Sequence, residues 1–561
     1  MPSYFCADPK TLMRVFLVLL PFLSATVLSE AQRFLPDDPV WIDLDSLPIP
    51  KPKSRKGSQI SDFMRNSMRP GPGSSDMTPA ENINTLGEVP DSSWFTNRMS
   101  RGTMSVPELV RGPNQTDGPG TSHPWTVISA KSEGITPGFT IRDRTGEMYF
   151  VKFDPLGHAQ LATSTEVICT KFFHAFGYHV PETHIARIML QDLEIGPKTR
   201  ITDEKGLKRK MSSEDLEAIF LKIPHLADGT VQALASRRLP GEPLGPFQYR
   251  GTRSDDANDI FPHEQRRELR GLRLFSAWLN HDDAPSINTL DMFLRQGETG
   301  YVKHHLIDFG SCLGSGTIKI QSRRAGNEYL AEWGPILKSA FSLGIWDRSW
   351  RKVFYPDYPS IGRFEAEYFE PVCWRPEYPN PAFQRMQPED AFWAVRIMMR
   401  FNDEAIRAIV KTGQLEDPSA ENYLVETLSK RRDKIVQHYL TQTDPLDRFQ
   451  VRVASSESRL EFVDLSSEVG MPPAVRYDYA WFRFNNQNGP MNSVIDQRSV
   501  KTASIPMPQD DSRYLAVQIE SLREGSRRKS EKVQVFIRNQ TQPVVVGIDR
   551  RSVSSSPGMA R

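Results

Sequence analysis

Alternating apolar and polar positions predict a group of β-strands that begins at Trp125. Three short segments show this pattern with a period of two, and glycines separate them. They are 125–128, 139–141 and 148–153. Segments of this kind, joined by turns that contain glycine, are typical of antiparallel strands. The pattern therefore predicts a small antiparallel sheet, and short apolar runs at 218–221 and 231–239 predict two later strands.

Beyond this sheet, apolar residues recur at helical spacing. Leu161, Ile168, Phe172 and Phe176 fall on one face of a predicted helix, which Gly177 ends. Further helices are predicted at 262–280, 388–411 and 421–439. The Pro- and Gly-rich stretch 240–243 breaks regular structure between the two parts. We therefore expect a sheet with one helix, followed by a mainly helical region.

Two further regions flank this central part. Residues 32–124 are rich in Pro, Ser, Gly and Asp, so we expect an extended segment that either wraps another domain or is partly disordered. Beyond residue 446 the alternating pattern returns and predicts an all-β, sandwich-like module up to residue 551. A Ser-rich tail follows at 552–561, which we expect to be disordered.

The first 31 residues have the pattern of a signal peptide. Lys10 and Arg14 precede the apolar run 15–28, and the small residues around Ala31 suit a cleavage site after it. A membrane anchor is the alternative, but a run of this length spans only about 21 Å as a helix, less than the ~30 Å hydrocarbon core. We therefore expect an exported protein, periplasmic or secreted, with no transmembrane helix in the mature chain.

Charge and cysteine content narrow the classes of function. The 70 Lys and Arg residues balance the 69 Asp and Glu residues, so we expect neither nucleic acid nor a membrane surface as a general partner. Apart from Cys6 in the signal, Cys169, Cys312 and Cys373 are widely spaced, which argues against a disulfide framework or a structural zinc site. One disulfide remains open, and the sequence does not select its pair.

Two motifs contain the residue types that phosphoryl transfer requires. Asp283 and Asn288 have the spacing of the H-R-D-x-x-x-x-N catalytic loop, and His281 falls on the histidine of that motif. After the apolar strand 305–307 comes a D-F-G triplet, whose aspartate, Asp308, is of the type that binds magnesium. Their order and their predicted elements both suit a phosphotransferase.

On these residues the chain resembles the protein-kinase-like superfamily, and more narrowly its atypical members: HipA-type kinases, phosphoinositide kinases, spore-coat CotH kinases and secretory-pathway kinases. By element order the resemblance extends over residues 125–445. It implies that Asp283 orients or deprotonates the acceptor. It also implies that Asn288 and Asp308 bind Mg²⁺ or Mn²⁺.

The resemblance extends to the predicted sheet and its helix. Lys152, in the strand 148–153, resembles the lysine that binds the phosphates of ATP or a related nucleotide. Glu166, in the following helix, lies where the family's lysine-pairing glutamate belongs. The glycine-rich phosphate loop would include Gly134 and Gly138, but it has two glycines rather than G-x-G-x-x-G. We expect the nucleotide to lie between the two lobes near 240–243.

Other departures alter the expected mechanism. Asp282 replaces the arginine of the H-R-D motif, which indicates that phosphorylation of an activation loop is not the switch here. No lysine follows Asp283, so another cation is needed to stabilise the γ-phosphate. Singly, each motif has a plainer interpretation: D-F-G can mark a strand that ends in a turn, and Lys152 can be one polar residue of an amphipathic strand.

Two other functions compete with the kinase interpretation. The run 310–314 has the form of a G-x-S-x-G nucleophile elbow with Cys312 as the nucleophile, which would indicate a hydrolase; the strand-like sequence after it does not suit that motif. The second alternative is a catalytically degenerate kinase fold that serves as a binding or scaffold protein outside the cytoplasm.

We therefore predict an α+β protein with a two-lobed, protein-kinase-like fold. Its function would be transfer of a phosphoryl group from a nucleotide to an unknown protein, lipid, sugar or small-molecule acceptor, with nucleotidyl transfer also open. The predicted units are a signal peptide (1–31), an extended segment (32–124), a small lobe (125–240), a helical lobe (241–445), a β-module (446–551) and a tail (552–561).

Overall fold

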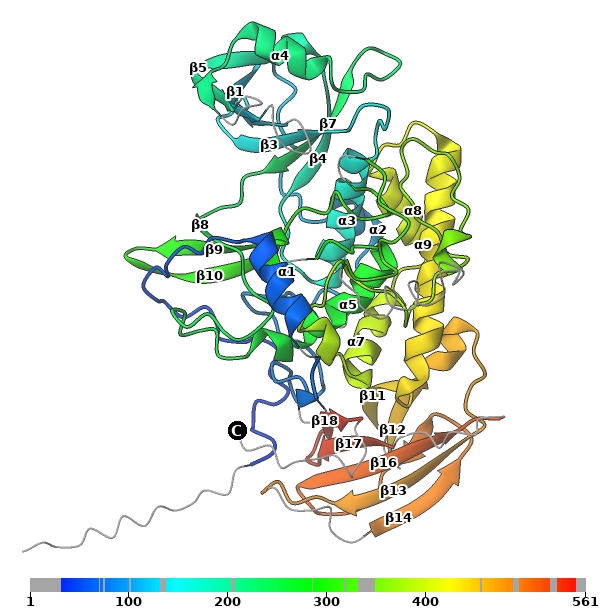
Figure 1. The fold of residues 1–561 in the computed structure, drawn as a ribbon. Coiled ribbons are helices and arrows are strands. Elements are labelled where there is room, and N and C mark those ends of the chain that lie inside the picture. The colour runs from blue at the N-terminus through cyan, green and yellow to red at the C-terminus, as the bar shows by residue number, and fades with distance from the viewer. Residues whose placement is uncertain are drawn as a thin grey trace, which may run out of the picture.

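The computed structural model describes residues 32–550, except 70, 74–75, 100–101, 132–137, 203–206, 285, 317–318, 331–348, 455–456, 488–493 and 525–531. The predicted signal peptide 1–31, Gly134 and the tail 552–561 lie outside the described residues. The protein is a mixed α and β structure. In Figure 1 a sheet lies at the top, a group of helices in the middle and a second group of strands at the bottom.

Seven strands form the upper sheet within the described residues, in the order β4-β7-β3-β2-β1-β5-β6. They are β1 (Trp125–Lys131), β2 (Gly138–Arg142), β3 (Met148–Phe153), β4 (Thr183–Ile188), β5 (Leu193–Thr202), β6 (Lys208–Lys210) and β7 (Val231–Arg237). The sheet is larger than predicted, and it is not purely antiparallel, because β1 and β5 pair in parallel. The pattern of alternation within one strand does not show the direction of its neighbour.

Residues 218–220 of the run 218–221, predicted as a strand, belong instead to helix α4 (Ser213–Phe220), and Leu221 follows its end. Ser212 precedes this helix, and its backbone N–H and hydroxyl both donate to Asp215, the third residue of the helix. Leu216, Ile219 and Phe220 are the buried residues of the helix. The start signal therefore outweighs the short apolar run, which by itself fits a strand or a helix.

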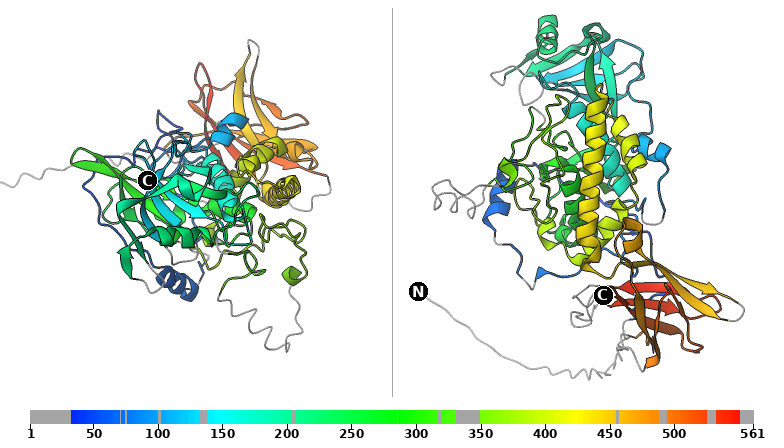
Figure 2. Two further views of the ribbon diagram at one scale, coloured as in Figure 1. Left: turned by 90° about the horizontal axis from the view of Figure 1, so that it is seen from above. Right: turned by 90° about the vertical axis from the view of Figure 1, so that its right-hand side faces the viewer.

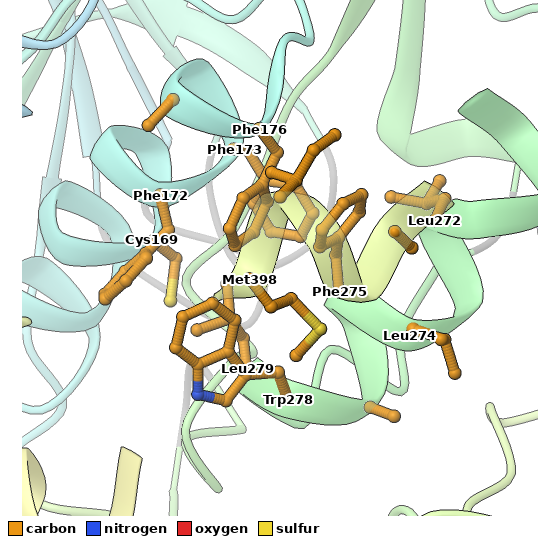
Figure 3. Packing of buried hydrophobic residues seen from close by; sticks show 14 of the residues in the cluster. Cys169, Phe172, Phe173, Phe176, Leu272, Leu274, Phe275, Trp278, Leu279 and Met398 are labelled. Atoms are coloured by element: carbon orange, nitrogen blue, oxygen red, sulfur yellow. The ribbon is translucent and has the colours of Figure 1, made fainter. Parts of the chain in front are cut away.

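The middle of the molecule is a helical core. Its helices are α3 (Ala162–Phe176), α5 (Arg267–Leu279), α7 (Pro388–Met398), α8 (Asp403–Lys411) and α9 (Pro418–Tyr439). Figure 3 shows Phe172, Phe173 and Phe176 of α3 packed against Phe275 and Trp278 of α5. The predicted helix 388–411 is divided in two, because Asn402 caps α8 by accepting a hydrogen bond from the Ala405 N–H.

A small sheet projects from this helical core (Figure 1). It has three described strands, β8 (Glu242–Gly245), β9 (Thr289–Gln296) and β10 (Thr299–Leu306), in the order β10-β9-β8. The predicted break at 240–243 is therefore only half correct, because residues 242 and 243 belong to β8. Because β9 begins one residue after Asn288 and β10 ends two residues before Asp308, this sheet holds both predicted motifs in place.

The described part of 32–124 runs along the whole molecule and contains two short helices, α1 (Gln59–Met68) and α2 (Val106–Arg111). Aromatic residues anchor it. Phe34 packs against Phe484, Tyr514 and Phe536 of the C-terminal strands, and Trp94 is buried at 4% exposure in the helical core. The segment therefore wraps around the other parts of the molecule.

Two antiparallel sheets form the C-terminal part, at the bottom of Figure 1. The first has the order β11-β12-β15 and the second β14-β13-β16-β17-β18. Their strands are β11 (Leu446–Val453), β12 (Ser458–Asp464), β13 (Arg476–Arg483), β14 (Val494–Val500), β15 (Ser504–Pro506), β16 (Tyr514–Leu522), β17 (Val533–Arg538) and β18 (Val544–Asp549). Figure 2 shows α9 running lengthwise from the level of the upper sheet to these strands. In the described part of the chain, no helix combines the length and the apolar character needed to cross a bilayer.

Candidate active site

A cleft of about 920 Å³ lies between the upper sheet and the helical core. Strands β1, β2 and β3 form one wall, and segments near both predicted motifs form the other. The described residues of the second wall include Asp282, Asp283, Ile287, Asn288, Ile307, Asp308, Ser311, Gln321, Arg324, Glu328 and Glu377. Residues 240–243 are not among the described residues that line it, so the predicted place of the nucleotide near that break does not coincide with the cleft.

Lys152 of β3 connects the two walls. Its Nζ lies 3.2 Å from Glu166 Oε2 and 2.9 Å from Asp308 Oδ1. Burial opposes the charged form of this lysine, but the two carboxylates outweigh burial and hold the pKa of Lys152 above its usual value. The structure thus brings Lys152 and Glu166 together with Asp308, which lies 156 residues from the lysine in the sequence.

Asp154, which sequence reasoning missed, fixes Lys152 relative to Glu166. Its carboxylate lies at the end of β3 and accepts hydrogen bonds from the backbone N–H groups of Ala162 (2.8 Å) and Thr163 (2.9 Å) at the start of α3. An acidic cap of this kind satisfies N–H groups that lack a partner within the helix. Since Glu166 lies one turn further along α3, this cap holds it opposite the lysine.

Asp308 has an unusual backbone conformation. Its φ is 63°, in the left-handed region that few residues other than glycine adopt. The next residue, Phe309, is fully buried and stacks on Phe173 of α3, with ring centroids 4.5 Å apart. The buried ring anchors the turn, while the Asp308 side chain stays 44% exposed in the cleft. Strained backbone of this kind persists where the surrounding packing fixes it, and it often occurs at functional sites.

Asp283 and Asn288 lie on the loop between α5 and β9. The Asn288 Nδ2 group donates to the Asp283 carbonyl at 3.0 Å, and the Ile307 N–H donates to the Asn288 carbonyl, also at 3.0 Å. The second bond places Asn288 beside the residue before Asp308. All five predicted residues with charged or amide side chains therefore belong to one site.

Carboxylates exceed cations in this part of the cleft. Burial, and then the charge of Glu377, raise the pKa of Asp283 to about 6. Burial also raises the pKa of Glu166 to about 6 in spite of Lys152. Asp283 Oδ1 is buried and has no hydrogen-bond partner among the described residues. Buried acceptors that lack a donor are costly, so this site suits a ligand that brings protons or positive charge.

Sequence reasoning missed several further residues of this cleft. Asp282, beside Asp283, is buried and accepts a hydrogen bond from Gln321; burial, followed by Asp283 and Glu377, raises its pKa to about 8. Arg324 also lines the cleft and supplies a positive charge near Glu377. The only sequence signal for Asp282 is its position next to Asp283. Arg324 and Glu377 belong to no local motif, so no sequence signal points to them.

Of the two predicted glycines, Gly138 lies among the described residues that line the cleft. Gly138 lies directly opposite Lys152 in the β2–β3 pair. A Cβ atom there would lie 2.8 Å from the Val151 carbonyl oxygen. Its lack of a side chain is therefore explained by close contact between strands. Gly134 lies outside the described residues.

The structure excludes the nucleophile elbow at 310–314. Cys312 is fully buried, so no substrate reaches its thiol. An elbow of that type opens into a helix, whereas here Ser315 forms a β-bridge with Ile320. No cysteine is among the described residues that line the cleft.

The oxygen donors of the cleft fit a magnesium or manganese ion that is shared with phosphate. Among the described residues, no group of three or more His, Cys, Asp or Glu side chains is placed to hold a metal ion. Magnesium is usually held by one or two carboxylates, with phosphate oxygens and water completing its shell. The Asp308 carboxylate and the Asn288 amide oxygen supply ligands of the required type.

Comparisons with known proteins gave matches among solved structures but none among family models or curated sequences. No protein-family model matches the sequence, and no curated protein sequence matches it. Among solved structures, the proinflammatory kinase CtkA of Helicobacter pylori is 13% identical with a TM-score of 0.30, over 54% of this chain and 93% of that chain. The Golgi casein kinase with Mn/ADP bound is 11% identical with a TM-score of 0.30, over 60% and 75%.

A second structure of the Golgi casein kinase is 10% identical with a TM-score of 0.28, over 68% of this chain and 86% of that chain. Each of these proteins is named as a kinase. All three TM-scores are 0.30 or lower, so these likenesses do not define the class of this protein.

Proposed function

We propose that this protein is an exported, kinase-like phosphotransferase that binds ATP or a related nucleotide with Mg²⁺ or Mn²⁺ in the cleft. One observation carries the proposal: the Lys152 ammonium contacts both Glu166 and Asp308, on the same cleft as Asp283 and Asn288. A purely structural ion pair has no need of a strained aspartate, an amide and a second carboxylate at one solvent-accessible site.

Each side chain has a defined role in this proposal. Lys152 binds phosphate oxygens, and Glu166 holds the lysine in place. Asp308 and Asn288 would hold the metal ion, which when bound neutralises charge on the phosphates. Arg324 provides a second cation that faces the cleft and takes the place of the lysine missing after Asp283. Together they position an anionic nucleotide in an otherwise acidic cleft.

Asp283 accepts the proton of the acceptor hydroxyl. The hydroxyl oxygen then forms a bond to the γ-phosphorus, and the bond between that phosphorus and the leaving nucleoside diphosphate breaks. A pKa raised to about 6 suits a group that takes up a proton near neutral pH. The Asp283 side chain is partly exposed and lines the cleft, which supports this role for its carboxylate.

Thermal-shift titration with ATP and Mg²⁺ or Mn²⁺ tests nucleotide binding. We expect the wild type to melt at a higher temperature when both are present, because ligands that bind only the folded state stabilise it. Asp308→Asn should lose this shift, whereas Asp433→Asn, an exposed control on α9, should keep it. A wild type that shows no shift with either metal contradicts the proposal.

Transfer and export are tested separately. Incubation with γ-labelled ATP and candidate acceptors distinguishes a phosphotransferase from the binding-protein alternative, which binds nucleotide without moving the label. N-terminal sequencing of the protein recovered outside the cytoplasm tests export, because the pattern at 1–31 implies a new N-terminus near residue 32. A recovered chain that still begins with Met1 contradicts the export proposal.

A further inference from the structure

Two cysteines lie directly behind the candidate active site. Cys169 is on α3, one turn after Glu166, and Cys312 follows Asp308 by four residues. Both side chains are fully buried, with 0% exposure. Figure 3 shows Cys169 among the aromatic side chains of the helical core. Neither residue has a role in the proposed transfer reaction, and both are free thiols in this structure.

The packing of the neighbouring rings brings these two thiols together. Phe173 lies one helical turn after Cys169, so the two side chains share a face of α3. Phe309 stacks on Phe173, and the Cys312 N–H donates to the Phe309 carbonyl at 3.0 Å, which closes a tight turn. Both cysteines and both rings thus belong to one buried hydrophobic cluster.

Direct contact between the sulfurs agrees with this geometry. Burial, and then a hydrogen bond with the Cys169 thiol, raise the pKa of Cys312 well above its usual range. In contrast, Cys373 is exposed and does not belong to this cluster. Of the three cysteines in the described residues, Cys169 and Cys312 are the two that share this buried cluster.

We propose that Cys169 and Cys312 form a disulfide when the chain folds in the presence of a small-molecule disulfide such as oxidised glutathione. One protein thiolate attacks the glutathione disulfide and releases one glutathione thiol. The second protein thiol loses its proton, attacks the mixed disulfide and releases the second glutathione thiol. Two protein thiols are thereby oxidised, and one glutathione disulfide is reduced to two thiols.

The burial of the pair determines when this reaction occurs. The thiolate is the reactive form, and the folded core disfavours it, so exchange takes place before α3 and the turn have packed together. Once formed, the disulfide is shielded from reductants. It joins the helix that holds Glu166 to the turn that holds Asp308, and so fixes the two carboxylates that contact Lys152. An oxidising compartment, as proposed for this protein, preserves such a bond.

Peptide mapping tests the pairing. The full chain is folded in a buffer of oxidised and reduced glutathione, quenched with acid, alkylated in denaturant and digested. We expect Cys6 and Cys373 to be alkylated, and one pair of peptides, containing Cys169 and Cys312, to be joined until reductant is added. Alkylation of all four cysteines, or a link that involves Cys373, overturns the proposal.

Thermal unfolding provides a second measurement. Closing so long a loop should raise the melting temperature of the oxidised protein by about 5 °C over the reduced protein. Cys169→Ala should abolish this difference, whereas the matched control Cys373→Ser should retain it. An equal difference in all three proteins contradicts the assignment. If Cys169→Ala does not fold, the peptide map of the wild type decides alone.

Discussion

Two groups of charged side chains in this molecule have opposite electrostatics. In the cleft, burial and neighbouring carboxylates raise the pKa values of Asp282 and Asp283. In the second group the pKa of Asp291 lies below its usual value, because His304 and Arg253 outweigh the effect of burial. The charged form of an aspartate is thus disfavoured in the cleft and favoured in the second group.

We call the second group the buried ion network; its members are Arg253, Asp259, His263, Arg266, Asp291 and His304. Asp291 accepts hydrogen bonds from Arg253 (2.8 Å) and His304 (2.7 Å). The indole of Trp94, from the N-terminal segment, stacks on His304 at 3.5 Å. Each carboxylate has at least one cationic partner, so this network fastens the segment and needs no ligand.

This comparison indicates that a binding site differs from a structural network by its excess of charge of one sign. The number of ion pairs distinguishes the two less well. The cleft holds charges that its own residues do not neutralise. Natural proteins accept such destabilising arrangements where function requires them. The following predictions test whether the two groups differ in this way.

Replacing Asp283 should have the largest effect, and in opposite directions for activity and stability. Asp283→Asn keeps the shape but cannot take up the acceptor proton, so transfer should fall by roughly 100-fold or more. The same change should raise the free energy of unfolding by about 1 kcal/mol at pH 7, since it removes a destabilised, partly screened charge. Single-turnover kinetics and denaturant unfolding measure the two effects. A clear loss of stability would show that the cleft resembles the buried ion network.

Removing Asp291 should instead cost stability alone. Asp291→Ala leaves Arg253 and His304 buried without their partner, so the free energy of unfolding should fall by about 3 kcal/mol. Urea unfolding followed by tryptophan fluorescence measures this change, with exposed Asp433→Asn as a control that changes it by less than about 0.5 kcal/mol. Nucleotide binding by the fraction that remains folded should be unaltered. A neutral effect on stability would remove the contrast between the two groups.

Buried histidines beside the network predict an acid-sensitive fold. Burial, followed by Lys303 and His304, lowers the pKa of His305 to about 3. The folded state holds this ring neutral, whereas the unfolded chain protonates it below about pH 6.5. The destabilising contribution of His305 is therefore absent above pH 6.5 and grows as the pH decreases, to about 2 kcal/mol at pH 5. His305→Gln should flatten the slope of unfolding free energy between pH 6.5 and 5; an unchanged slope contradicts this assignment.

The smallest expected effect concerns Arg324. Arg324→Gln should weaken nucleotide binding about tenfold, because a charge-assisted contact to phosphate is lost. The neighbouring Arg323→Gln is the matched control, since Arg323 donates to the Val353 carbonyl at 2.7 Å and is not among the described residues of the cleft. Calorimetric titration with ATP and metal measures both variants. Equal losses in the two would show that Arg324 has no special role.

Local signals in the sequence selected several of the residues that the structure brings together in the candidate site, and they located part of the fold. Spacing selected Asp283, Asn288 and Asp308, and the order of elements selected Lys152 and Glu166. Strong periodicity located α3 and α5. The parallel pairing of β1 with β5 and the helical state of 218–221 were missed, because the direction of a neighbouring strand and the packing of a short apolar run depend on residues distant in the chain.

The sequence by itself determined which residue types the cleft contains and in what order. Only the tertiary structure decided their relations: that Asp308 and Glu166 share one lysine, that Asp154 caps α3, that Arg324 lines the cleft, and that Cys169 and Cys312 belong to one buried cluster. The physical reason is that charge balance and side-chain contact depend on distances in space. A local motif fixes chemistry over a few residues, whereas the fold alone brings its partners from segments up to hundreds of residues away.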